Sequence, residues 1–173
     1  MNVAILIPPN DFSDETVSST LTLMQKWGVT TVIASGTLGE CVGHHGARLR
    51  SSVTLSDITT DNFDGIIIPD GVGVDTYKMY DARQLLDIIK HFNQRERPLA
   101  FINNSVKILA RANVITNKKI ASISDRETVR LVQLFRGTIT NNELEADGNI
   151  ITLSNTEKIN ELVDAMLDRL HVR

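Results

Sequence analysis

The chain has 173 residues, and its 18 Lys plus Arg against 21 Asp plus Glu give a net charge of −3 with neutral histidines. Hydrophobic residues make up 42% and charged residues 23%, which excludes a disordered or low-complexity chain. The acidic balance argues against nucleic-acid partners, and no apolar run approaches the roughly 20 residues of a membrane span. The first residues enter a strand-like run rather than a signal peptide. We therefore expect one cytoplasmic domain over residues 1–173, without membrane or nucleic-acid partners.

Short apolar runs alternate with helical patterns along the chain. Runs rich in β-branched residues predict buried strands at residues 2–7, 29–34, 64–68 and 99–102. Apolar residues at helical spacing predict amphipathic helices at residues 14–27, 81–93 and 156–170. Strand, helix and strand in succession indicate a parallel sheet with right-handed crossovers. The predicted fold class is α/β, with a mostly parallel sheet covered by helices on both faces.

The remaining segments are less regular. Residues 36–46 contain four glycines and predict a loop, and the alternating residues 47–53 predict a half-exposed strand beside it. The segments 124–127 and 154–157 both match the Ser-x-x-Glu capping box and predict two helix starts. Between these helices, residues 150–153 predict a further short strand.

Open parallel sheets bind ligands at the carboxyl ends of their strands, so the segments that follow the predicted strands are the expected place for a ligand site. The strand at 99–102 passes into a helix at Val106 across Asn103-Asn104-Ser105. A strand that enters a helix within three residues is the outline of a nucleophile elbow, which holds its first residue in a strained conformation. We call residues 103–105 the elbow. Its first residue is Asn, which has no nucleophilic chemistry at neutral pH.

Seven segments, taken in order, match one known family in sequence and spacing. They are residues 29–35, 43–46, 63–69, 98–102, 112–115, 118–119 and 146–149. By their order the chain resembles the ThiJ/PfpI superfamily, and most closely its intracellular-protease-like and deglycase-like branch. The resemblance covers nearly the whole chain and implies a flavodoxin-like three-layer fold, like that of class I glutamine amidotransferases.

The resemblance also implies where a site would lie, because family enzymes place a reactive cysteine at the elbow. A histidine and then a glycine commonly follow that cysteine. Here Asn103 stands in the place of the cysteine, Asn104 in that of the histidine and Ser105 in that of the glycine. The nucleophile and the histidine are therefore absent together.

Two further family positions complete the expected pocket. A strand-end Gly-Gly pair that helps to form an oxyanion hole appears here as Asp70-Gly71. An acidic residue of the first helix, which contacts the cysteine in the family, corresponds to Asp14, Glu15 or Thr16, and the resemblance leaves the choice among these three open.

The pocket candidates are Glu15, Asp70, Gly71, Asn103 and Asn104. We expect Asn103 to have a positive φ, a conformation that Asn adopts more readily than most residues. The following backbone N–H groups then favour a small anionic or carbonyl ligand.

Other reactive side chains have simpler interpretations. Ser105 is expected to cap the helix that follows it, since no histidine lies nearby in sequence to activate it. Cys41, His44 and His45 lie in the glycine-rich segment, where a surface loop is favoured over a metal site that would lack its fourth ligand. We expect no metal and no cofactor.

Two classes of function follow. The first is a non-catalytic family member with a small-ligand-binding or assembly role, motivated by the joint loss of cysteine and histidine. The alternative is a hydrolase, lyase or deglycase-like enzyme that acts on small carbonyl compounds or peptides by acid–base chemistry of Glu15 and Asp70. The resemblance also implies a homo-oligomer, at least a dimer.

Overall fold

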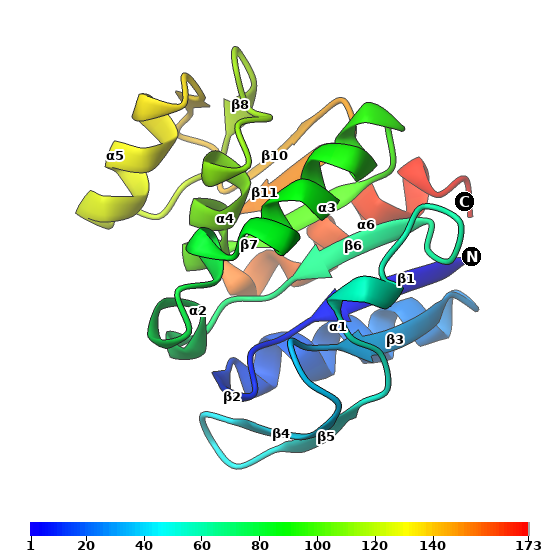
Figure 1. Cartoon of the computed structure of the whole chain (residues 1–173). Coiled ribbons are helices and arrows are strands. Elements are labelled where there is room, and N and C mark those ends of the chain that lie inside the picture. Colours follow the sequence, from blue (N-terminus) through cyan, green and yellow to red (C-terminus); the bar gives the residue numbers. More distant parts are fainter. Residues whose placement is uncertain (173) are drawn as a thin grey trace.

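The structure, a computed structural model, describes residues 1–172 and is built around a six-stranded sheet (Figure 1). The strand order is β10-β11-β7-β6-β1-β3. Its strands are β1 (Asn2–Leu6), β3 (Thr30–Ala34), β6 (Gly65–Ile68), β7 (Leu99–Ile102), β10 (Leu144–Asp147) and β11 (Ile150–Leu153). All neighbours pair in parallel except β10, which runs antiparallel to β11.

Helices cover both faces of this sheet. The α-helices are α1 (Asp14–Lys26), α2 (Val72–Thr76), α3 (Arg83–Gln94), α4 (Val106–Arg111), α5 (Arg126–Leu134) and α6 (Ile159–Arg169). Four 3-10 turns connect them, η1 (Leu55–Asp57), η2 (Met79–Asp81), η3 (Asn103–Ser105) and η4 (Thr156–Lys158). Helices α1 and α6 lie behind the sheet in Figure 1, and α3 and α4 lie in front of it. The three-layer α/β fold predicted from the sequence is confirmed, and so are its three long helices.

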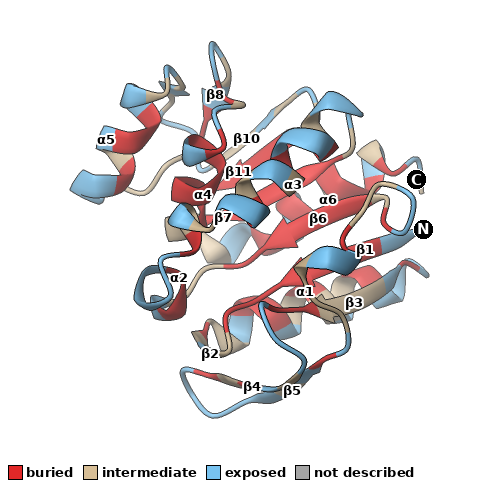
Figure 2. Ribbon diagram, in the orientation of Figure 1, coloured by how far each residue is buried: buried red, intermediate tan, exposed pale blue. Residues whose placement is uncertain are grey.

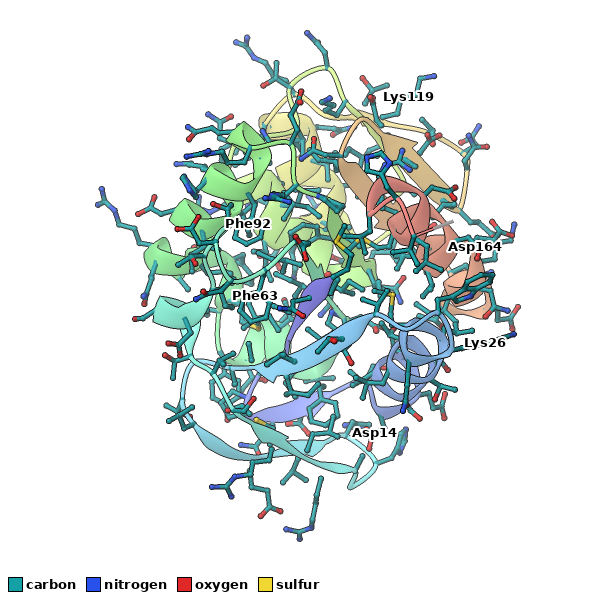
Figure 3. All side chains as sticks on the ribbon, turned by 90° about the vertical axis from the view of Figure 1, so that its right-hand side faces the viewer. Asp14, Lys26, Phe63, Phe92, Lys119 and Asp164 are labelled. Atoms are coloured by element: carbon teal, nitrogen blue, oxygen red, sulfur yellow. The ribbon has the colours of Figure 1, made fainter. Side chains whose placement is uncertain are left out.

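The core consists of one apolar layer on each face of the sheet, because strand side chains alternate between the faces. Ala4 and Leu6 of β1 join the layer beneath α3 and α4, whereas Val3 and Ile5 join the layer beneath α1 and α6. The central strands are buried along their length in Figure 2. Phe63 and Phe92, labelled in Figure 3, belong to the first of these layers.

The four strands predicted to form the buried centre are all parallel, as expected, but one of them is not central. Strand β3 lies at an edge of the sheet and is mostly half-buried. The fourth central strand is instead β11, which pairs with β7 in parallel and is fully buried. The sequence does not predict this central position for β11, because the strand has only four residues and lies in the less regular last third of the chain.

The glycine-rich segment forms part of a second, three-stranded sheet, so the predicted loop over residues 36–46 is wrong at its centre, whereas the half-exposed strand predicted over residues 47–53 is confirmed by an antiparallel strand at residues 48–51. This sheet consists of β2 (Asn10–Phe12), β4 (Gly39–Gly43) and β5 (Arg48–Ser51). Cys41 lies on β4 in the same apolar layer as Phe12, and both side chains are buried. A third sheet pairs β8 (Lys119–Ile120) with β9 (Thr138–Ile139).

The two predicted capping boxes are each displaced by one residue. Helix α5 is capped by Asp125, whose carboxylate accepts the Thr128 N–H at 3.0 Å. Asn155 in turn accepts the N–H of Glu157 at 3.0 Å at the start of η4. Asp, Asn and Ser cap helices about equally well, so residue type alone does not distinguish the two neighbouring positions. Within residues 1–172, no helix is long and apolar enough to cross a membrane.

Candidate functional site

The elbow has the geometry that the sequence predicts for it. Strand β7 ends at Ile102, the turn η3 follows at once, and Asn103 has a φ of 49°. The predicted positive φ of Asn103 is confirmed. The buried Ser105 hydroxyl accepts the Ile102 N–H at 2.8 Å and lies 2.7 Å from the Ile68 carbonyl oxygen. Ser105 therefore ties the end of β6 to the end of β7 and does not cap α4, contrary to the expectation.

Asn103 is hydrogen-bonded to Asp70, which lies in the loop after the neighbouring strand β6. Its Nδ2 donates a hydrogen bond to Asp70 Oδ2 at 2.9 Å. The amide oxygen of Asn103 and the second carboxylate oxygen of Asp70, Oδ1 in both residues, are buried and have no hydrogen-bond partner within the described residues. Buried acceptors without a donor cost about 1–3 kcal/mol each. A hydrogen-bond donor at either oxygen would therefore stabilise this part of the elbow.

Asn104 is bound to the backbone of Gly71 in both directions. Its Oδ1 accepts the Gly71 N–H at 3.2 Å, and its Nδ2 donates to the Gly71 carbonyl oxygen at 2.7 Å. The same Nδ2 lies 3.2 Å from Asp75 Oδ2. The N–H of Gly71, which an incoming oxygen would need, is thus already occupied by the protein's own side chain.

Gly71 adopts a conformation that only glycine enters easily, with a φ of 149°. A Cβ there would lie 2.5 Å from the Asp11 carbonyl oxygen and 2.8 Å from the Phe12 Cα. Both contacts are with backbone, which cannot move aside as a side chain can. The loop after β6 therefore packs directly on strand β2, and Gly71 lies where Asn104 can reach it.

Gly71→Ala should lower the free energy of unfolding by about 3 kcal/mol, because it combines a strained φ with a backbone clash. Urea denaturation of the wild type and the variant measures the loss. The matched control is Gly36→Ala, since Gly36 has open space around its Cα. A loss at position 71 no larger than at position 36 would contradict the packing described.

Glu15 lies at a small cavity beside this loop. The cavity has a volume of about 140 Å³ and is lined by Ser13, Glu15, His44, His45, Gly71 and Val72. The two imidazole rings meet edge to face with centroids 4.9 Å apart, and His44 Nδ1 lies 3.6 Å from Asp11 Oδ1. The two histidines are exposed on the turn between β4 and β5, as expected, yet the fold brings them to the edge that holds Glu15.

Asp14 is engaged by a different contact and so leaves Glu15 as the acidic residue at the cavity. The Asp14 carboxylate accepts the backbone N–H groups of His45 and Ala47 at 2.9 and 2.8 Å. Figure 3 shows it at the start of α1, beside the β4–β5 hairpin. Partial burial opposes ionisation, but these hydrogen bonds, with that of its own N–H and the charge of His45, outweigh it. The pKa of Asp14 is consequently lowered below its ordinary value of 3.8.

The lowered pKa predicts a stability contribution that is lost in acid. Because the carboxylate form is favoured in the folded protein, Asp14 stabilises it fully above pH 3.8 and progressively less as pH falls through its folded pKa. Urea denaturation of the wild type and Asp14→Asn between about pH 6 and pH 3 tests this. The gap between the two proteins should be constant near neutrality and shrink below pH 3.8. A gap that widened in acid would refute the assignment.

A buried lysine, Lys107, is connected to the elbow through Asp75. The Lys107 side chain is 3% exposed, and its Nζ pairs with Asp75 and lies 3.7 Å from Glu127 Oε2. It also lies 5.0 Å from the centroid of the Tyr80 ring. Burial and the charge of Glu127 raise the pKa of Tyr80. Because Asp75 also accepts from Asn104, a continuous polar chain runs from Lys107 to the Gly71 backbone.

The fold, the elbow and the strand-end loop agree with one family of proteins. A profile of the DJ-1/PfpI family matches residues 1–169. The chain belongs to the DJ-1/PfpI family. Among solved structures, it is similar to a ThiJ/PfpI domain protein from Brachyspira murdochii, with a TM-score of 0.91 and 20% identity over 99% of this chain and 97% of that one.

Two curated relatives share 27% and 23% of their aligned residues with this chain. An uncharacterized protein of Methanocaldococcus jannaschii is 27% identical over 150 residues, which cover 87% of this chain and 73% of that protein. The deglycase PfpI of Pyrococcus furiosus is 23% identical over 115 residues, which cover 66% of this chain and 68% of that protein.

The five pocket candidates lie together at one edge of the sheet. Asn103 contacts Asp70, Asn104 contacts Gly71, and Gly71 shares its cavity with Glu15. Within residues 1–172, however, no hydrogen bond or ion pair joins Glu15 to Asp70, and no cluster of His, Cys, Asp and Glu is arranged to hold a metal ion. Sequence reasoning missed Asp75 and Lys107, and the only sign of the latter is a charge among the apolar residues of the first turns of α4.

Proposed function

We propose that this DJ-1/PfpI protein is non-catalytic and binds a small ligand at the elbow. The observation that carries the proposal is the asparagine at the residue with φ of 49°, hydrogen-bonded to Asp70. An asparagine amide offers two donors and an acceptor but no nucleophile. The single thiol of the chain, Cys41, is buried in the second sheet instead.

The proposed site consists of Glu15, Asp70, Gly71, Asn103 and Asn104. We infer that its ligand is a small anionic or carbonyl compound. The adjoining cavity of about 140 Å³ favours such a size, because sites for drug-sized ligands occupy roughly 300–1,000 Å³. The unpartnered oxygens of Asp70 and Asn103 favour a compound that also donates, as a hydrated carbonyl group does through its hydroxyls.

Such a ligand has to compete with Asn104. Its Oδ1 occupies the Gly71 N–H that would bind an incoming oxygen. Asn104→Ala should therefore bind pyruvate about fivefold more tightly than the wild type, the equivalent of roughly 1 kcal/mol for one freed hydrogen bond. Isothermal titration at several pyruvate concentrations measures the change. Asn93→Ala, a partly buried asparagine that bonds Asn149, is the control. Weaker binding by the Asn104 variant would contradict the competition.

Enzyme assays test the absence of catalysis. Purified protein should be assayed for loss of methylglyoxal and for peptide cleavage, with Glu15→Ala and Asp70→Asn alongside. A flat result in all three proteins supports the proposal. Activity in the wild type that either variant loses would overturn it in favour of acid–base catalysis.

We further propose that the protein is cytoplasmic and forms at least a homodimer. Family membership supports self-association. Light scattering at micromolar concentration should then give at least twice the chain mass of 19.2 kDa. A monomer would contradict this part of the proposal.

A further inference from the structure

We propose that the protein has a second binding site, for an uncharged apolar molecule of about two rings, separate from the elbow. The site is a cavity of about 330 Å³ at the carboxyl ends of β1 and β3. It is lined by Leu6, Ile7, Pro8, Pro9, Gly36, Thr37, Leu55, Tyr77, Met79, Ala82 and Leu85. None of these residues belongs to the proposed elbow site or to the smaller cavity beside it.

The charge of the lining excludes an ionic ligand. No Asp, Glu, Lys, Arg or His lines the cavity, so a charged group would lose its hydration without gaining a partner. The floor is formed by Leu6, Ile7 and Leu85, which are at most 2% exposed and belong to the core. Burial of apolar surface is thus the force that this site offers a ligand.

The backbone around the cavity has few hydrogen-bonding groups left to offer. Ile7 donates its N–H to the Ala34 carbonyl oxygen at 2.9 Å, and its own carbonyl accepts the Ser35 hydroxyl at 2.7 Å. The Pro9 carbonyl accepts from Val42 at 2.9 Å. Pro8 and Pro9 have no N–H at all. Because these groups are satisfied or missing, the inner wall favours a molecule with little hydrogen-bonding demand.

One wall is an aromatic ring fixed in place. The Tyr77 hydroxyl lies 2.7 Å from Asn10 Nδ2, which orients the ring at the cavity. Tyr77 is 44% exposed, and Leu38, which follows the lining residue Thr37, is 65% exposed. The cavity therefore opens to solvent between apolar side chains, and a ligand can enter without unfolding the core.

The volume sets the size of the occupant. A cavity of roughly 150 Å³ lined by apolar side chains accepts benzene. A cavity of about 330 Å³ has room for about twice that, such as indole or a compact bicyclic terpene. It is also at the lower end of the roughly 300–1,000 Å³ of ligand sites in general.

Indole is the probe for the test, followed by NMR of the full-length protein. Saturable shifts are expected at Ile7, Met79 and Leu85 with millimolar or tighter affinity, and sodium benzoate should produce none. Ala82→Leu fills the cavity and should lower the affinity for indole at least tenfold. Thr37→Phe, which fills it from the rim, replaces that variant if it fails to fold. Ala146→Leu, on the exposed edge strand β10, is the matched control and should bind like the wild type.

Four results would overturn the proposal. One is shifts that do not saturate, the second is equal affinity in the cavity-filling and control variants, and the third is binding of benzoate as tight as that of indole. The fourth is a homodimer that buries the cavity residues and leaves indole unbound, which would assign this surface to a second copy instead.

Discussion

Asn103→Cys is expected to yield a folded protein whose new thiol reacts with iodoacetamide at least about tenfold faster than Cys41 at neutral pH. Cys41 is 2% exposed, whereas Asn103 is only half-buried at the strand-end edge. The hydrogen bonds of Ser105 to the ends of β6 and β7 hold the elbow independently of the side chain at 103. Mass spectrometry of peptides after timed alkylation gives both rates in one sample.

The negative charge of Asp70 should slow the reaction of the new thiol, and a second substitution tests this. Its carboxylate lies against the side chain of residue 103 and disfavours a thiolate there. Adding Asp70→Asn to Asn103→Cys should therefore accelerate alkylation further. Adding Glu40→Gln, a change on the distant strand β4, should not. A thiol at 103 that is as unreactive as Cys41 in both backgrounds would show that the elbow is closed to ligands.

Asp75→Asn is expected to lower the free energy of unfolding by about 2 kcal/mol, because it leaves the buried Lys107 ammonium with Glu127 as its remaining carboxylate partner, while solvent partly screens Asp75, which is 46% exposed. The change is isosteric, so packing is retained and the loss reports the charge. It also removes an acceptor of Asn104 Nδ2. Urea denaturation at neutral pH measures the loss.

An exposed ion pair nearby provides the matched comparison. Asp81 pairs with Arg111 at 3.0 Å, and both side chains are more than a third exposed. Asp81→Asn should cost less than about 1 kcal/mol, since solvent screens such pairs. Equal losses for the two variants would mean that the Lys107 pair is no more desolvated than a surface pair.

The parts of the fold that the sequence predicts are those whose signal is local. Residues 64–68 and 99–102 are continuous apolar runs, and the structure places them side by side at the centre of the sheet. The positive φ of Asn103 was expected from the family resemblance at the elbow, and Asn adopts such a φ more readily than most residues.

The parts that escaped prediction depend on contacts between distant segments. Strand β4 has a glycine at each end, and its pairing with β2 and β5 is invisible in its composition. Whether Asp14 or Glu15 faces the site depends on the β4–β5 turn, whose backbone N–H groups engage Asp14. The sequence around Lys107 gives no indication that its side chain is buried, because its carboxylate partners Asp75 and Glu127 come from α2 and α5.

The most direct test of the central claim is an NMR titration that follows the side-chain amides of Asn103 and Asn104 as pyruvate is added. Pyruvate combines a carboxylate with a carbonyl group that hydrates, and its own signals report turnover in the same tube. Saturable shifts of both amides are expected, while the pyruvate signals should stay constant over hours. Loss of pyruvate signal, or amides that do not respond at any concentration, would contradict a non-catalytic ligand site at the elbow.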